Sequence, residues 1–246
     1  MKDLNGVRVT FTKADLAHLN DGQLKIIGVF PHILNRLKML ESQVYAHMNV
    51  ALDESLENAK REVAVCAFVE SVILIAGELK EGWEAFQQCY YQTKVSLAMN
   101  GALPAEIQTR LKRLSGHFTG TSLATFLRNN FAYHNSPGTI VETMKLLEND
   151  DTMAFYILAE DNHYFDYTTK IRIAAIAERL RVSDWTQVVT PLLQEIMGKV
   201  FNDVYLSMSV ILRDILTTVA HERSSIEVKG VPSDQELRSE VFFHMQ

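Results

Sequence analysis

The stretch that decides the fold runs from Val63 to Gly77 and reads VAVCAFVESVILIAG. It is the most apolar window of the chain, yet it contains Glu70 and is shorter than the roughly 20 apolar residues that a membrane span needs. Apolar residues recur in and before it at intervals of three and four positions, as on one face of a helix: Leu56, Ala59, Val63, Cys66, Val69, Ile73 and Ala76. We therefore predict a buried helix here.

Helical periodicity continues along most of the chain. A second apolar stripe follows Asp184 and consists of Val189, Leu193, Ile196, Val200, Val204, Met208, Ile211, Ile215 and Val219. Pro31 predicts a kink or a split in an earlier helix that begins near Asn20. Residues 153–167 are the least helical and favour a small hairpin or irregular insertion. The sequence predicts one all-α helical bundle over residues 1–246, with a loosely packed tail after residue 223.

Composition limits the function classes. The 246 residues are 47% hydrophobic and 22% charged, as in soluble globular proteins. Two cysteines cannot form a disulfide framework, and the N-terminus lacks the apolar centre of a signal peptide, so we expect a cytoplasmic protein. A net charge of −6 argues against indiscriminate nucleic-acid binding, which normally needs a broad positive field.

Basic residues nevertheless gather in one part of the chain. No Asp or Glu occurs from Ile107 to Val141. A short predicted helix in this segment carries four candidates for RNA binding: Arg110, Lys112, Arg113 and His117. The alternative is that this basic helix face is only solvated. Any RNA contact is expected to be confined to the acid-free segment or to depend on a second subunit.

The same segment contains the sequence RNNFAYH, from Arg128 to His134. Arginine binds phosphate oxygens through a planar fork of donors, and histidine can transfer a proton near neutral pH. Arg128 and His134 are separated by five residues, and the first of these, Asn129, is polar. This pattern resembles the signature of the HEPN superfamily. Upstream, residues 74–83 read LIAGELKEGW and resemble a segment of HEPN proteins from bacterial abortive-infection systems. The resemblance covers about residues 54–147.

This resemblance implies a HEPN-type helical bundle and a metal-independent endoribonuclease in a bacterial toxin or phage-defence setting. His134 would act as acid/base, Arg128 as the phosphate clamp and Asn129 as a supporting hydrogen-bonding group. The family also implies a homodimer, an RNA substrate and, in toxin–antitoxin pairs, an antitoxin protein, with no cofactor. One subgroup has a Tyr two residues after the His as a modification site, where this chain has Ser136.

The spacing of Arg128 and His134 needs an explanation. Six residues along an ideal α-helix rotate about 600°, which leaves the two side chains about 120° apart and about 9 Å apart along the axis. Either the helix bends or ends before His134, or a twofold dimer brings two copies into one cleft.

Other interpretations stay open. Arg128 and His134 can be ordinary residues at a helix end. Residues 160–163 contain the Glu-x-x-His pattern of di-iron bundles, but such sites need two copies and further glutamates, so we predict no metal. The alternatives to the enzyme are a non-catalytic helical dimer that serves as an interaction or nucleic-acid-binding module, and a bundle that binds a small apolar ligand.

Overall fold

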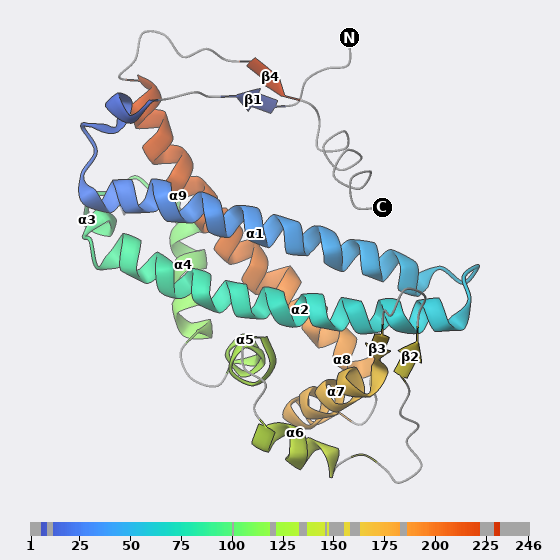
Figure 1. Cartoon of the computed structure of the whole chain (residues 1–246). Helices are drawn as coiled ribbons and strands as arrows, with labels where there is room; N and C mark the ends of the chain where they lie inside the picture. Colours follow the sequence, from blue (N-terminus) through green and yellow to red (C-terminus); the bar gives the residue numbers. More distant parts are fainter. Residues whose placement is uncertain are drawn as a thin grey trace.

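The computed structural model describes residues 6–8, 12–99, 101–118, 122–132, 137–145, 147, 155–157, 163–182, 186–221 and 229–231. Helices form nearly all of this part of the chain, and the prediction of an all-α bundle is confirmed (Figure 1). That the chain is one domain, and that its bundle is of HEPN type, stay predictions. In the predicted tail after residue 223, the structure describes only the short strand β4.

Two long helices form the centre of the bundle, α1 (Asp21–Leu52) and α2 (Asn58–Phe86). They run antiparallel and side by side along most of their length (Figure 1). Asn20 and Gln23 begin α1 with a capping box, in which the Asn20 side chain accepts from the Gln23 amide at 3.0 Å. Pro31 lies inside α1 without splitting it, because Phe30, Ile33 and neighbouring apolar residues hold both halves against the core.

Shorter helices pack around this pair. They are α3 (Val95–Met99), α4 (Ala105–His117), α5 (Leu123–Leu127), α6 (Pro137–Met144), α7 (Asp166–Leu180), α8 (Thr186–Pro191) and α9 (Asn202–His221). The 3₁₀ turn η1 (Lys13–Leu16) precedes α1, and the described residues include π-helical segments at η2 (Gln87–Tyr91), η3 (Arg128–Ala132) and η4 (Leu192–Phe201). The segments α8, η4 and α9 follow one another without interruption, which gives the long final helix that the second stripe predicts.

Four short strands complete the described elements. Strand β2 (Phe155–Ile157) pairs antiparallel with β3 (His163–Phe165), with Phe155 opposite Phe165. This pair lies where the sequence predicts a hairpin. Strand β1 (Gly6–Arg8) pairs antiparallel with β4 (Lys229–Val231), which the sequence analysis did not predict.

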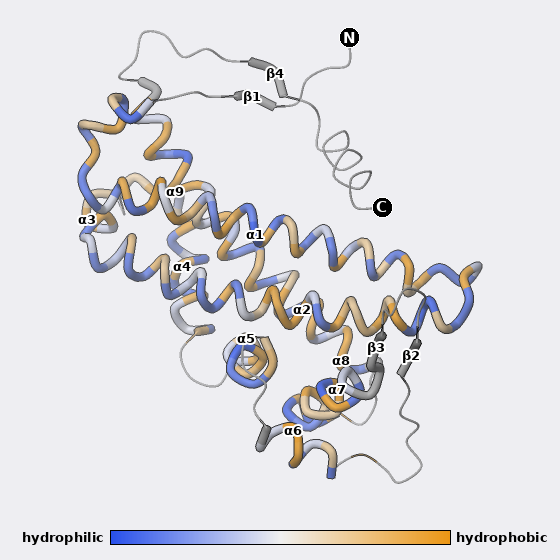
Figure 2. Tube along the Cα trace, in the orientation of Figure 1, coloured by the Kyte–Doolittle hydropathy of each residue, from blue (hydrophilic) through white to orange (hydrophobic). Residues whose placement is uncertain are grey.

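The core is one connected cluster of buried apolar side chains from Leu19 to Val219. Figure 2 shows apolar residues recurring along α1, α2 and α9. The second stripe is buried from Ile196 onward, whereas Val189 and Leu193 are half-buried. The first stripe is buried from Cys66 onward, but Ala59 near the start of α2 is exposed. Further along, α2 buries more than one face, because helices cover it from several directions.

Three glutamates of α2 form ion pairs with three different neighbouring elements. Glu78, which is almost fully buried, lies 2.8 Å from the guanidinium of Arg36 in α1. Glu70 pairs with Arg172 of α7, and Glu81 pairs with Arg128 of η3. Each pair therefore links α2 to an arginine that is distant in the sequence. Among the described residues, no helix is long and apolar enough to cross a membrane.

Candidate functional site

Arg128 begins the π-helical turn η3, which continues α5. Ser122 caps α5 by accepting from the Thr125 amide at 3.2 Å. Leu127 and Phe131 are buried, and α5 and η3 both pack on α2. This packing turns the partly exposed side chain of Arg128 toward α2. Its place on a π-helical turn is of interest because such turns are frequent at functional sites.

Among the residues that the structure describes, the guanidinium of Arg128 has two partners. Its Nε and Nη2 donate to Oε1 of Glu81 at 2.9 and 2.6 Å, and its Nη1 donates to Oδ1 of Asn129 at 3.1 Å. Residues 107–141 contain no Asp or Glu, but the fold places Glu81 of α2 next to Arg128. The carboxylate fixes the orientation of the guanidinium and offsets part of its charge.

Glu81 belongs to residues 74–83, the upstream segment of the family resemblance, so the two segments that carry the resemblance are in contact. The sequence analysis quoted Glu81 without giving it a role. Its spacing along α2 carries no sign of its partner, since Arg128 is 47 residues away.

His134 lies outside the described residues, as do Tyr133, Asn135 and Ser136. The structure does describe the chain on both sides of this segment. Oγ1 of Thr139 in α6 donates to Oδ1 of Asn130 in η3 at 3.0 Å, and Nδ2 of Asn130 donates to the Phe126 carbonyl at 2.8 Å. The residues that flank the segment are thus held together.

The four predicted RNA-binding residues of α4 divide into two groups. Arg110, Arg113 and His117 lie on one face and line a cleft, whereas Lys112 is exposed and does not line it. Phe118, the residue after His117, stacks on Trp83 with ring centroids 5.8 Å apart. The end of α4 therefore lies against the same turn of α2 that carries Glu81.

Both arginines of this face bind a buried carboxylate. Arg110 Nη1 donates to Oδ1 of Asp203 at 2.6 Å, and Arg113 holds Asp203 in a fork, with Nε to Oδ2 at 2.9 Å and Nη2 to Oδ1 at 2.8 Å. Arg110 also binds Glu106. Hydrogen bonds, to Glu106 first and then to Asp203, raise the pKa of Arg110. Asp203 was not predicted, although a carboxylate inside an apolar stripe signals a buried partner.

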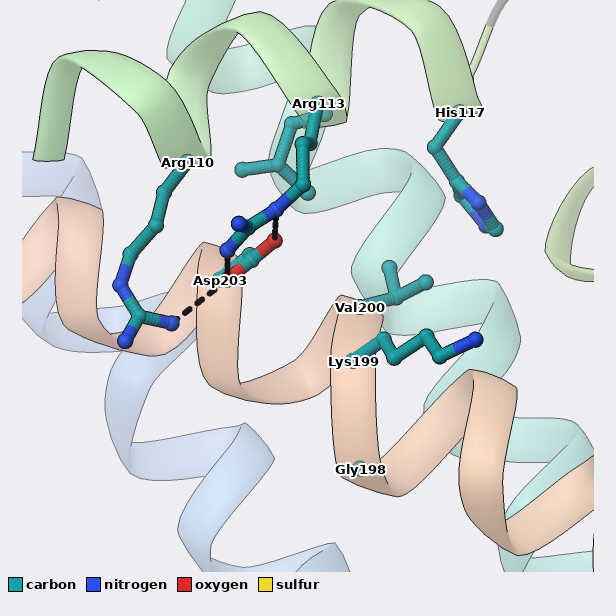
Figure 3. Close-up of a pocket in the computed structure, with 8 residues that line it drawn as sticks. Arg110, Arg113, His117, Gly198, Lys199, Val200 and Asp203 are labelled. Carbon is teal, nitrogen blue, oxygen red and sulfur yellow. Dashed lines mark hydrogen bonds and ion pairs between the residues drawn. The ribbon is translucent and has the colours of Figure 1, made fainter. Parts of the chain in front are cut away.

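The cleft itself has a volume of about 510 Å³ and lies between α4 and the junction of η4 with α9. Figure 3 shows the arginines gathered on Asp203 toward one end, and His117 and Lys199 toward the other. Burial lowers the pKa of His117, against the smaller opposing effects of Glu195 and Asp203. The ring Nε2 is buried without a hydrogen-bond partner among the described residues, and Oε1 of Glu195 lies 3.9 Å away.

The described residues contain no group of three or more His, Cys, Asp or Glu side chains arranged to hold a metal ion. Glu160, which begins the Glu-x-x-His pattern, lies outside them. No family model matches this chain, and neither a curated protein nor a solved structure matches it.

Proposed function

We propose that this protein is a metal-independent endoribonuclease of the HEPN type, with Arg128, Asn129 and His134 at its centre. One observation carries the proposal: Glu81 and Asn129 hold the guanidinium of Arg128 in a fixed orientation on a partly exposed π-helical turn. A positioned donor stabilises developing charge without reorganising during the reaction. The cytoplasm of a bacterium, in a toxin or phage-defence role, is the setting that the family resemblance suggests.

Arg128 keeps donors for a phosphate. A guanidinium has five N–H groups, and the described residues use three of them, two on Glu81 and one on Asn129, so two are not used within the described part of the chain. Because the Oδ1 of Asn129 accepts from Arg128, the amide NH₂ of the exposed Asn129 can donate as well. These groups form the phosphate clamp of the proposed site.

In the proposed reaction His134 accepts the proton of a ribose 2′-hydroxyl as that oxygen attacks the adjacent phosphorus. The bond from phosphorus to the 5′-oxygen of the next nucleotide breaks, and this oxygen takes up a proton from His134, which returns to its starting state. The products are a 2′,3′-cyclic phosphate and a 5′-hydroxyl end. Arg128 stabilises the negative charge on the phosphorane-like intermediate. In a homodimer the two copies of the motif would share one cleft, and an antitoxin protein would block it.

The second candidate function is a non-catalytic helical dimer that serves as an interaction or nucleic-acid-binding module. The ion pair itself favours this alternative, because Glu81 offsets the charge that a phosphate would need. A solvated arginine paired with a carboxylate is also a common structural feature of helix packing.

Cleavage of single-stranded RNA separates the two functions. We expect Arg128→Ala and His134→Ala each to lower the rate by about 10²–10⁴-fold, with Asn129→Ala and Glu81→Gln intermediate. Excess chelator should leave the rate unchanged, and the rate should fall below about pH 6, near the ordinary pKa of histidine.

Melting curves of all variants check the fold, and Arg213→Ala, at an exposed position of α9, is the matched control. Equal rates in wild type and His134→Ala would refute the mechanism, and no cleavage by any form would favour the interaction module.

Assembly is tested separately by sedimentation at tens of micromolar protein. A dimer supports a site composed of two copies of Arg128 and His134. A monomer would contradict it and would leave a bend or an end of the helix before His134 as the way to bring the pair together.

A further inference from the structure

A second pocket lies next to the turn that carries Arg128, between η3, α6 and the end of α7. Its volume is about 400 Å³, within the range of roughly 300–1,000 Å³ that is typical of small-molecule sites. Phe126 and Asn130 line it, two positions before and two positions after Arg128. Figure 1 shows α5, α6 and α7 gathered on the same side of α2. An occupant of this pocket would therefore lie beside the proposed RNA-cleaving site.

The charged side chains of the pocket balance one another. Two acids and two arginines line it: Glu142 of α6, Glu178 and Arg179 of α7, and Arg181 directly after α7. Their formal charges sum to zero, so the pocket offers no net positive charge to a phosphate group. A neutral ligand that both donates and accepts hydrogen bonds suits this lining better.

Glu178 and Arg181 can bind the same side of a ligand. They lie three positions apart, and the Arg181 amide donates to the Glu178 carbonyl at 3.0 Å. Neither side chain forms a hydrogen bond or an ion pair with the described residues, although both line the pocket. A carboxylate with two acceptor oxygens therefore lies near a guanidinium with a fork of donors.

The backbone of Arg181 has a conformation that favours glycine. Its φ is 57°, in the left-handed region, and the Val182 amide donates to the Ala177 carbonyl at 3.0 Å, as is common at the end of a helix. Arginine is less stable than glycine in this conformation. Residues held in unfavourable conformations are concentrated at binding and catalytic sites, which indicates a role for the Arg181 side chain.

The pocket also presents planar groups. The Cζ atom of Arg179 lies 5.8 Å from the centroid of the half-buried Phe126 ring. RNA bases stack on aromatic rings and on guanidinium groups. A base in this pocket would therefore have a planar surface to stack on and a polar edge to bind.

We infer that this pocket binds a guanine base of the substrate RNA close to the cleaved bond, an inference that rests on the proposed ribonuclease function. Guanine has two adjacent donors, N1–H and the 2-amino group, which suit the two oxygens of the Glu178 carboxylate. Its O6 and N7 are two adjacent acceptors, which suit the guanidinium of Arg181. Adenine, cytosine and uracil do not combine two adjacent donors with two adjacent acceptors.

Calorimetric titration of the full chain with guanosine tests the pocket without a phosphate group, so the phosphate clamp plays no part. We expect a dissociation constant below about 1 mM for guanosine, and values at least about tenfold higher for adenosine and cytidine. Inosine, which differs from guanosine only in lacking the 2-amino group, should bind more weakly than guanosine.

Two variants test the two side chains. Glu178→Gln and Arg181→Gly should each weaken guanosine binding at least about tenfold. Arg181→Gly should melt at the wild-type temperature or above it, because glycine suits a positive φ, so its loss of binding cannot come from unfolding. Lys94→Gly is the matched control, since Lys94 is exposed, has a φ of 64° and does not line the pocket. It should bind guanosine like wild type.

Cleavage of RNAs that differ only in one guanine or adenine links the pocket to the reaction. Wild type should cleave next to guanine at least about tenfold faster than next to adenine, and both pocket variants should lose this preference. Guanosine binding by a chain that cleaves no RNA would support the pocket and refute the proposed function. Cleavage without a preference for guanine, equal affinities for guanosine, adenosine and cytidine, absence of guanosine binding, or unchanged guanosine affinity in both variants would each overturn the inference.

Discussion

Gly22 and Gly28 both lie near the start of α1, but their surroundings differ. A Cβ on Gly22 would lie 2.6 Å from Thr93 Oγ1 and 2.6 Å from Val95 Cγ2, which is closer than such atoms can approach. A Cβ on Gly28 would meet nothing within 4 Å. The close approach at Gly22 lets the first turn of α1 pack directly on the chain between η2 and α3.

These two glycines give a matched pair of substitutions. Gly22→Ala should lower the free energy of unfolding by about 1–3 kcal/mol, because the neighbours must move to admit the methyl group. Gly28→Ala should raise it by about 0.5–1 kcal/mol, because alanine is favoured over glycine inside a helix. Urea unfolding of both variants measures the difference. Equal stabilities would contradict the close packing at Gly22.

At the scale of residues, the sequence shows which basic side chains a segment contains, but it does not show which carboxylates surround them in the fold. Arg110, Arg113 and Arg128 occur in a segment without acids, yet each is bound to a carboxylate from outside it. Asp203 is 90 residues from Arg113, and Glu81 is 47 residues from Arg128. Charge along the chain cannot reveal such pairs, because they depend on how helices pack.

At the scale of elements, Asp203 joins α9 to α4. Its side chain is 7% exposed and binds two arginines of α4. Removal of the carboxylate leaves the two guanidinium groups of α4 side by side without the acid that they share. Asp203 is therefore the charged link between these two helices, beside their apolar packing.

Asp203→Ala should lower the free energy of unfolding by about 2–3 kcal/mol, somewhat less than a fully buried pair because Arg113 is largely exposed. Arg113→Ala should cost less, about 0–1 kcal/mol, because Arg110 still binds Asp203. Chemical denaturation of both variants checks the order. A larger loss in Arg113→Ala would show that Asp203 does not hold the junction.

Two histidines at helix contacts predict how stability depends on pH. Burial lowers the pKa of His47, whose Nδ1 lies 3.1 Å from Ser71 Oγ between α1 and α2, and burial also lowers the pKa of His117. The unfolded chain, with an ordinary histidine pKa near 6.5, therefore binds more protons than the folded chain as the pH falls. Stability is retained above this pKa and decreases below it.

We expect the melting temperature to fall as the pH is lowered from about 7.5 to about 5.5. The double variant His47→Gln, His117→Gln should show a smaller fall, whereas His32→Gln, at an exposed position of α1, should behave like wild type. Scanning calorimetry at several pH values measures this. Parallel curves for wild type and the double variant would disprove the assignment.

The spacing of apolar residues predicts most helices and the hairpin, but it does not predict where a helix is π-helical or how it responds to a proline. It places the buried helix at residues 63–77 and the hairpin within residues 153–167, since apolar spacing reports which face is buried. It misses the π-helical segments at η2, η3 and η4, because apolar residues three and four positions apart are interpreted as α-helix and carry no separate sign of the wider turn. Of the two effects predicted for Pro31, a kink or a split, the split is absent, because α1 continues through this residue.

At the scale of the whole molecule, most of the buried apolar residues that the structure describes, from Leu19 to Val219, form one cluster. Trp83 lies inside it and stacks with Phe86 and Phe118. A chain with one core should unfold in a single cooperative step. In Trp185→Phe, where Trp83 is the remaining tryptophan, fluorescence and far-ultraviolet circular dichroism should give the same urea midpoint. Two separated midpoints would contradict the single domain predicted for residues 1–246.

The three glutamates of α2 have a consequence for recognising distant relatives of this chain. Glu70, Glu78 and Glu81 are separated by eight and then three positions, and their partners lie on three different elements. A single insertion between them would turn the rest of α2 by about 100° and separate each later acid from its arginine. Surface loops can change length freely during divergence. The ungapped spacing of these acids, together with Arg36, Arg128 and Arg172, is therefore a fingerprint that can persist after overall sequence identity has been lost.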